Sequence, residues 1–267
     1  MLQLFHSPCP NDTFLFYAFS KGKVPFAPPV QTHMADIQTL NELALAGKPD
    51  IGKISFSILP HLESQYVLLP VGAALGFGNG PKLVARETFS LKEMGTKRVA
   101  IPGATTTAAH LFRILLPDCA KTVALPYQEI LPAVVRGEVD AGVIIHEARF
   151  LLSAYKCVEI VDLGALWEEK TQGPIPLGGL VAKRSLGIDL IAEITVALQR
   201  SLAYAKAHTE MVWPYVEEHS QEKERHVIQQ HLDLYVNRYT EALDDAALRS
   251  IDLLRSGGEV QCETSMH

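Results

Sequence analysis

Short apolar runs alternate with helical patterns over the first two thirds of the chain. Runs of β-branched and apolar residues bounded by turn residues predict strands. These runs are Leu2 to His6, Val30 to His33, Asp50 to Phe56, Tyr66 to Leu75, Lys82 to Ala85, Arg98 to Ile101, Thr122 to Leu125, Ala141 to Ile145, Val158 to Val161 and Leu177 to Ala182. Helical spacing of apolar residues between most of them predicts an α/β fold.

Two helical regions have predicted ends. The helix after the first strand is expected to be capped by Asn11, Asp12 or Thr13. From Ile188 to Gly257 the chain is expected to be helical, with an amphipathic face that ends at a glycine pair. The histidines of this last region, which include His231, are expected to be surface or structural residues.

The strand pattern divides the chain into two lobes. A polar stretch from Ser90 to Lys97 precedes a new strand–helix series, and Leu177 to Ala182 then echoes Pro81 to Ala85. We therefore expect a first lobe of residues 1–87 plus 179–267, with the C-terminal helices, and a second lobe of residues 88–178. Two α/β lobes joined by two crossing strands, with a cleft between them, are typical of the periplasmic-binding-protein-like fold (type II).

Composition narrows the class of protein. The 267 residues are 48% hydrophobic with a formal net charge of -6, so the basic stripe that nucleic-acid binding needs is missing. No segment has the length of a membrane span, and the N-terminus does not look like a signal peptide. Four isolated cysteines predict neither a zinc site nor a disulfide framework. We expect a cytoplasmic protein without a metal, nucleic-acid or membrane partner.

Three polar turns follow predicted strands and suit an anionic ligand. Ser7 to Thr13 contains two prolines and opens a helix, and Lys53 with Ser55 ends the third strand. Thr105 to Thr107 lead into a helix whose first N–H groups are free to bind an anion. Ordinary βα loops, a solvated lysine and a threonine N-cap would produce the same patterns.

The stretch from Val139 to Phe150 is the strongest candidate for chemistry. Its apolar strand ends at His146 and Glu147, and ligands of open α/β sheets collect outside the carboxyl ends of strands. A neutral imidazole there can accept a proton. A helix-capping or hydrogen-bonded core histidine is the alternative interpretation.

Four segments together resemble the 1,4-dihydroxy-6-naphthoate synthases, the cyclic dehypoxanthinyl futalosine lyases of the futalosine route to menaquinone. The segments are Ser7 to Phe14 (SPCPNDTF), Lys53 to Ser55, Gly103 to Ala108 and Ile144 to Glu147. The resemblance covers nearly the whole chain, and the first segment is the most distinctive. The family pattern His-Glu-Gly-Arg has Ala148 in place of its glycine here, which leaves the histidine unchanged.

The resemblance implies a lyase that releases 1,4-dihydroxy-6-naphthoate and dihydroxyacetone from a small-molecule substrate, cyclic dehypoxanthinyl futalosine, with no cofactor. It implies that His146 is the general base. The residues it implies for substrate binding are Lys53, Ile54, Ser55, Thr106, Thr107, Ala108, Ser7, Asn11 and Asp12. A homodimer through the C-terminal helices is a further expectation.

Other functions remain open from the sequence. Chorismate dehydratase of the same pathway shares the fold type, and a non-catalytic solute-binding protein would share the architecture. A hydrolase using Ser7 or Cys9 is disfavoured because no paired base or G-x-S-x-G motif accompanies them. The substrate carboxylate has three candidate partners, namely Lys53, Arg149 and backbone amides.

Overall fold

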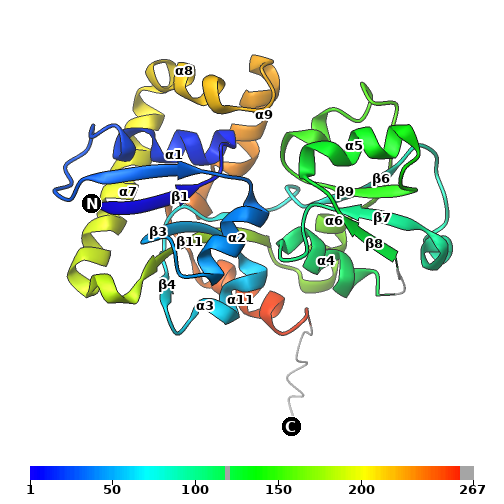
Figure 1. Cartoon of the computed structure of the whole chain (residues 1–267), viewed down its shortest axis with the longest axis horizontal. Coiled ribbons are helices and arrows are strands. Elements are labelled where there is room, and N and C mark those ends of the chain that lie inside the picture. Colours follow the sequence, from blue (N-terminus) through cyan, green and yellow to red (C-terminus); the bar gives the residue numbers. More distant parts are fainter. Residues whose placement is uncertain (118–120, 259–267) are drawn as a thin grey trace, which may run out of the picture.

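The computed structural model describes residues 1–117 and 121–258, which form two α/β lobes side by side (Figure 1). Each lobe has its own sheet, and hydrophobic residues cover both faces of each sheet. Sheets buried on both faces explain why strands such as β3 (Ile51–Ser55) and β9 (Ala141–Ile144) are buried along their whole length.

The first sheet has the order β2-β1-β3-β11-β4, with β5 paired to β11. Its strands are β1 (Leu2–His6), β2 (Val30–Met34), β3 (Ile51–Ser55), β4 (Tyr66–Leu68), β5 (Ala74–Gly76) and β11 (Ile175–Lys183). β1 runs parallel to β2 and β3, so the carboxyl ends of these strands lie at one edge. The long β11 lies inside the sheet and runs antiparallel to β3 on one side and to β4 and β5 on the other.

The second sheet has the order β10-β6-β9-β7-β8. Its strands are β6 (Lys82–Ala85), β7 (Arg98–Ile101), β8 (Lys121–Ala124), β9 (Ala141–Ile144) and β10 (Val158–Asp162). β7 and β9 are parallel, and their carboxyl ends face the first lobe across the molecule.

Helices cover both sheets. They are α1 (Pro10–Ser20), α2 (Ile37–Leu45), α3 (Leu59–Leu62), α4 (Thr107–Leu115), α5 (Tyr127–Arg136), α6 (Leu163–Thr171), α7 (Ile188–Ala207), α8 (Thr209–His219), α9 (Arg225–Tyr235), α10 (Arg238–Glu241) and α11 (Asp245–Arg255). Short 3₁₀ turns are η1 (Phe56–Ile58), η2 (Leu91–Thr96), η3 (His146–Phe150) and η4 (Arg184–Leu186). The C-terminal helices pack on the first lobe, as expected (Figure 1).

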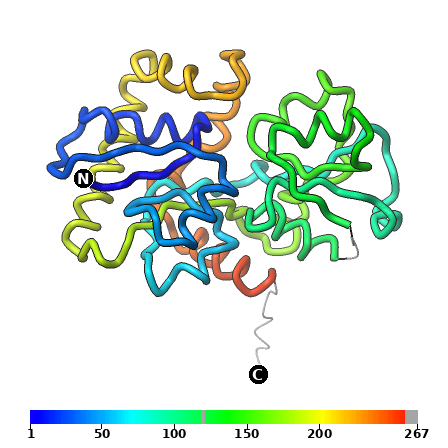
Figure 2. The backbone as a smooth tube through the Cα atoms, in the orientation of Figure 1, coloured from blue at the N-terminus to red at the C-terminus, as the bar shows by residue number. Residues whose placement is uncertain are grey.

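The chain passes between the lobes twice (Figure 2). The passages lie at residues 77–81, between β5 and β6, and at residues 172–174, between α6 and β11. The expected limits between the lobes were 87/88 and 178/179, but the pairing of the strands places both changes of sheet earlier in the chain. β6 belongs to the second sheet because it pairs with β9 and β10, and β11 enters the first sheet at Ile175.

Two local expectations are corrected. The helix α1 begins at Pro10 with Cys9 as its N-cap, so Asn11, Asp12 and Thr13 lie inside its first turn instead of capping it. Proline suits the first helical position because its fixed φ and missing N–H cost nothing there. The expected strand from Tyr66 to Leu75 is two strands, β4 and β5, which pair with different parts of β11.

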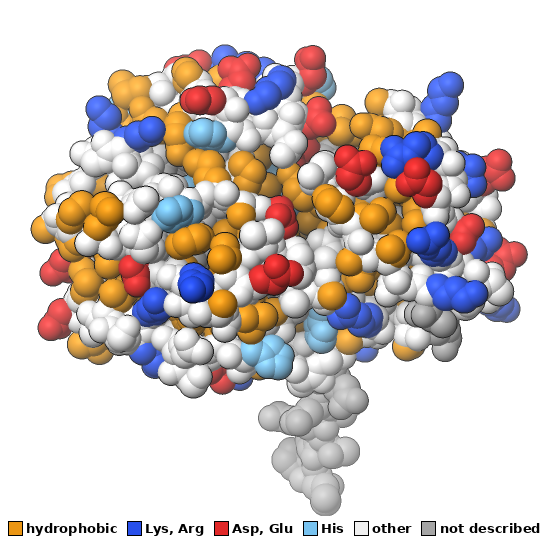
Figure 3. Space-filling model, in the orientation of Figure 1, with side chains coloured by type: hydrophobic (Ala, Val, Ile, Leu, Met, Phe, Trp, Pro, Cys, Tyr) orange, Lys and Arg blue, Asp and Glu red, His pale blue; other side chains and the backbone are white. Residues whose placement is uncertain are grey.

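The face of the molecule drawn in Figure 3 shows acidic and basic side chains intermixed, with no large area of one charge. Among the described residues, no helix is both long enough and apolar enough to cross a membrane.

Candidate active site

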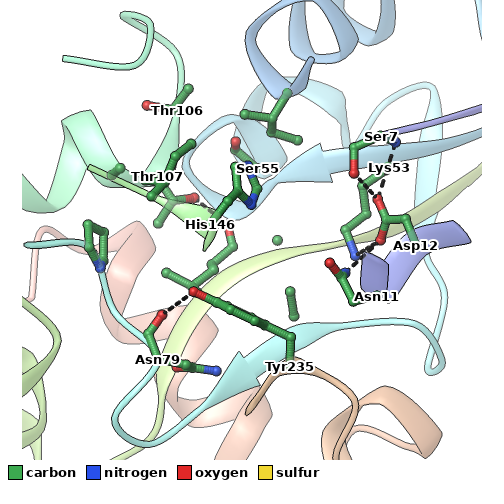
Figure 4. Close-up of a pocket in the computed structure, with 17 residues that line it drawn as sticks. Ser7, Asn11, Asp12, Lys53, Ser55, Asn79, Thr106, Thr107, His146 and Tyr235 are labelled. Atoms are coloured by element: carbon green, nitrogen blue, oxygen red, sulfur yellow. Dashed lines mark hydrogen bonds and ion pairs between the residues drawn. The ribbon is translucent and has the colours of Figure 1, made fainter. Parts of the chain in front are cut away.

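A pocket of about 640 Å³ lies where the carboxyl ends of β1 and β3 face those of β7 and β9. The predicted site residues that line it are Ser7, Asn11, Asp12, Lys53, Ser55, Thr106, Thr107, Ala108 and His146. Figure 4 shows their side chains arriving from both lobes. Ile54 is the exception, because side chains alternate along a strand and its own side chain packs in the hydrophobic core of the first lobe.

Asp12 is the centre of a polar network on the first lobe. Its Oδ1 accepts hydrogen bonds from Asn11 Nδ2 at 2.9 Å and pairs with Lys53 Nζ at 3.0 Å. Its Oδ2 accepts from the hydroxyl of Ser7 at 2.7 Å (Figure 4). Burial raises the pKa of Asp12, but the charge of Lys53 and these donors outweigh it and hold the pKa below its ordinary value. Lys53 also donates to the carbonyl of Gly72 at 2.9 Å, so two of its three N–H donors have partners within the first lobe.

The threonine turn, residues Thr105 to Thr107 of the second lobe, lines the opposite side of the pocket from the network of Asp12. Thr106 is the N-cap of α4, and its hydroxyl accepts from Ala109 N and donates to Gly103 O. The hydroxyl of Thr107 donates to Leu177 O at 2.6 Å. Both hydroxyl protons are therefore used within the protein. The donors left for a ligand are the N–H groups of the first helical turn, which have no acceptor inside the helix.

His146 faces the pocket from the end of β9 in an unusual conformation. Its φ of 55° is in the left-handed region, which costs a non-glycine residue about 1–3 kcal/mol. The ring lies edge-on to Tyr127, and its Nδ1 is 3.6 Å from Cys9 Sγ. Desolvation lowers the pKa of His146 to about 4, and Asp12 opposes that shift only in part. The imidazole is consequently neutral near pH 7.

Behind His146 lies a group of buried residues that the sequence analysis did not assign to the site. Glu147 is 2% exposed and His231 is fully buried. His231 Nε2 lies 2.8 Å from Asn11 Oδ1, and its Nδ1 lies 3.9 Å from Glu147 Oε2. His231 is thus a structural residue at the site and not a surface residue. The only sequence signal was the adjacency of Glu147 to His146.

Arg149 braces a loop at the pocket entrance. Its guanidinium donates to the carbonyls of Gly78 at 2.8 Å and Gly80 at 3.2 Å, and Tyr235 donates to Asn79 O at 3.0 Å. Asn79 and Tyr235 both line the pocket, and the sequence analysis missed them as well. The Asn79 side chain is 1% exposed, with no hydrogen-bond partner among the described residues. Arg149 is therefore held by backbone and does not reach the pocket lining.

Cys9, His146 and Glu147 bring a sulfur, a nitrogen and an oxygen atom within 4.8 Å of one another. Such a set suits a thiophilic cation only when the thiol is ionised. Burial and the neighbouring Glu147 raise the pKa of Cys9 well above its usual value. The geometry accordingly favours a neutral thiol that contacts the ring of His146.

Glu147 is expected to destabilise the folded protein as the pH rises towards neutrality and its buried carboxyl group ionises. Burial raises its pKa to about 7 in the folded state, against 4.5 for an ordinary glutamate side chain. The folded state therefore binds the proton more tightly, and stability falls as the pH rises from about 4.5 to 7. The loss corresponds to about 3 kcal/mol above pH 7, at 1.36 kcal/mol per pKa unit.

Urea unfolding at pH 5 and pH 8 tests this. Glu147→Gln should be more stable than the wild type at pH 8, and the difference should shrink at pH 5. Equal pH dependence of the two proteins would contradict the raised pKa.

The fold and the pocket define a class first. This is a two-lobed protein of the periplasmic-binding-protein-like fold, whose ligand pocket lies between the lobes and carries a neutral histidine. A solved Candida albicans protein described as having the generic periplasmic binding protein fold aligns with a TM-score of 0.69 at 11% identity, covering 97% of this chain and 90% of that one. The expected fold class is confirmed.

Comparison with known proteins then identifies the family. The family model described as "Menaquinone biosynthesis" matches residues 2–259. The chain is 41% identical to the 1,4-dihydroxy-6-naphthoate synthase of Streptomyces coelicolor, covering 97% of this chain and 93% of the relative. It is 42% identical to the enzyme of that name from Thermus thermophilus, covering 97% and 94%. An Archaeoglobus fulgidus crystal structure aligns with a TM-score of 0.91 at 31% identity, covering 96% of both chains.

The chain belongs to this menaquinone-biosynthesis family. The resemblance stated from the sequence is confirmed, and so is the expectation of an enzyme of the naphthoate synthase type.

Proposed function

We propose that this chain cleaves cyclic dehypoxanthinyl futalosine to 1,4-dihydroxy-6-naphthoate and dihydroxyacetone, with His146 as the general base. The observation that carries the proposal is the position of His146: a neutral imidazole, at the end of β9, facing a pocket between two lobes. The similarity to the two naphthoate synthases indicates the class of reaction. The position of His146 at the pocket provides a base that can start that reaction.

The chemistry needs a base and an enclosed space. His146 Nδ1 lies beside Cys9, so Nε2 is the nitrogen available to take a substrate proton. Loss of that proton starts cleavage of a carbon–carbon bond next to oxygenated carbons, and aromatisation of the naphthalene ring supplies the driving force. The proton held on Nε2 is then available to the departing three-carbon fragment. Exclusion of water by the two lobes strengthens each interaction in the pocket.

The substrate carboxylate is proposed to bind the N-terminus of α4. Lys53 is neutralised by Asp12, and Arg149 is held by the carbonyls of Gly78 and Gly80. The backbone N–H groups of Thr107 and Ala108 remain, at the positive end of the helix dipole. Lys53, Ile54 and Ser55, with Thr106, Ser7, Asn11 and Asp12, are proposed to complete the binding surface, Ile54 only through its backbone.

One feature of the first lobe suits closure around a ligand. Asn41 on α2 donates to the carbonyl of Thr105 at 3.2 Å, and Ser57 donates to the same carbonyl at 2.6 Å. These hydrogen bonds join the first lobe to the threonine turn of the second.

The cytoplasmic location and the homodimer stay predictions.

The direct test is to mix the purified protein with cyclic dehypoxanthinyl futalosine and, separately, with chorismate, and to follow products by absorbance and mass. We expect dihydroxynaphthoate and dihydroxyacetone from the first and no product from the second. Turnover of chorismate would assign the chain to the dehydratase step. Tight binding of a small acid without turnover would favour the solute-binding alternative.

A further inference from the structure

Glu147 is a buried carboxyl group whose hydrogen-bonding capacity is largely unused. It is 2% exposed, and its Oε1 has no hydrogen-bond partner among the described residues. A charged group in that position is costly unless a positive partner is near. The two titratable groups nearest to this carboxyl group on either side are His231 and His146.

His231 lies on the far side of Glu147 and makes no hydrogen bond to it among the described residues. Its Nε2 faces the Asn11 Oδ1 acceptor at 2.8 Å, which assigns the ring hydrogen to Nε2 in the neutral tautomer. Its Nδ1 then carries a lone pair and lies 3.9 Å from Glu147 Oε2, with no hydrogen-bond partner in the described part of the chain. Burial, followed by the charge of His146, lowers the pKa of His231 well below its usual value. His231 therefore stays neutral and does not act as the positive partner.

His146 is on the near side. The Sγ atom of Cys9, a ring nitrogen of His146 and a carboxylate oxygen of Glu147 all lie within 4.8 Å of one another. The rings of His146 and His231 are stacked, with centroids 6.3 Å apart. An opposite charge at about 4–6 Å shifts a pKa by about 1–3 units. A proton on His146 would thus give Glu147 the positive partner that the resting site does not provide.

We propose that Glu147, which lies close to His146 and His231, is the positioning residue of the base and that its ionised carboxylate stabilises the imidazolium formed on His146 during turnover. This inference rests on the proposed role of His146 as the base. It assigns a role in the reaction to a buried carboxyl group that does not itself line the pocket.

The inference predicts two activity levels separated near neutral pH. The groups that face Glu147 are Cys9 at the start of α1, Tyr127 on α5, His146 on η3, His231 and Tyr235 on α9, and Glu222 before α9. Arg149 on η3 acts on His231 and Tyr235, and its guanidinium is bound by the carbonyls of Gly78 and Gly80. Burial raises the pKa of Cys9, Tyr127 and Tyr235 away from neutrality and lowers that of both histidines. Burial, aided by Glu222, brings the pKa of Glu147 to about 7.

The experiment is the pH profile of kcat from pH 5 to 9 for the wild type, for Glu147→Gln and for Glu129→Gln, an exposed control on α5 of the same lobe. The wild type and the control should rise by about 10- to 100-fold through pH 7, the factor that one to two pKa units of added basicity represents. Glu147→Gln mimics the neutral carboxyl, so its kcat should stay at the low level at every pH. KM should change less than about twofold, because the side chain does not line the pocket.

An unchanged profile in an active Glu147→Gln would overturn this inference alone. An inert wild type, or full activity in His146→Ala, would overturn the proposed function and this inference with it. A second measurement, nitrogen-15 NMR of the wild-type histidines, does not require Glu147→Gln to fold. The His146 signals, assigned by comparison with His146→Gln, should shift with an inflection near pH 7, and a flat response there would overturn the inference.

Discussion

Replacing His146 with alanine is expected to lower kcat for cyclic dehypoxanthinyl futalosine by about 10²–10⁴-fold, the usual contribution of a positioned base. His146 is neutral at working pH and is one of many residues that line the pocket, so its loss removes the proton acceptor and leaves the other lining residues in place. The substrate Kd should change less than about threefold, since uniform binding does not depend on the base.

Steady-state kinetics and calorimetric binding measure both quantities. His61→Ala is the matched control, since His61 is exposed on α3 and should retain wild-type kcat. Retained turnover in His146→Ala would remove this residue from the mechanism. A parallel loss in His61→Ala would point to a general effect of histidine replacement.

The second large effect is on stability. Lys53→Met leaves the carboxylate of Asp12 buried without its ion-pair partner, and we expect a loss of about 3–5 kcal/mol in the free energy of unfolding at pH 7. Lys206→Met is the control, because the Lys206–Glu241 pair is at the surface and should contribute less than about 1 kcal/mol. Urea unfolding of both variants measures the difference.

The stability deficit of Lys53→Met is expected to depend on pH, because it comes from the ionised carboxylate of Asp12. In the wild type the pKa of Asp12 lies below its ordinary value, so the carboxylate contributes stability above that ordinary value and loses it as the pH falls through the folded-state pKa. Without Lys53 that contribution is gone, and the deficit of the variant should shrink below about pH 4. Asp12→Asn combined with Lys53→Met should recover part of the loss. A deficit that is constant with pH would show that Asp12 is not its source.

Much of the binding pocket could be predicted from the sequence because it follows a general rule for open α/β sheets. Polar turns at the ends of β1, β3, β7 and β9 had to meet at the sheet edges once the strands were parallel. Ile54 was expected at the site only because the family resemblance includes the segment from Lys53 to Ser55. Side chains alternate along β3, so the side chain of Ile54 packs in the hydrophobic core instead.

Other features depended on contacts between distant residues. β6 resembles a strand of either lobe, and only its pairing with β9 and β10 assigns it to the second sheet. His231 lies on a helix with no local sign of function, yet packing of α9 against the first lobe brings it to Asn11 and Glu147.

The sequence by itself determined the α/β class and the residue types at the strand ends, because local periodicity and turn chemistry act over a few neighbouring residues. It also indicated the family, through the resemblance of four segments spread along the chain. The tertiary structure decided which charges are paired, as for Asp12 with Lys53, and which buried atoms have no hydrogen-bond partner in the described part of the chain, as for Oε1 of Glu147. Electrostatic energies depend on distance and burial across lobes, and neither quantity can be read from the order of residues.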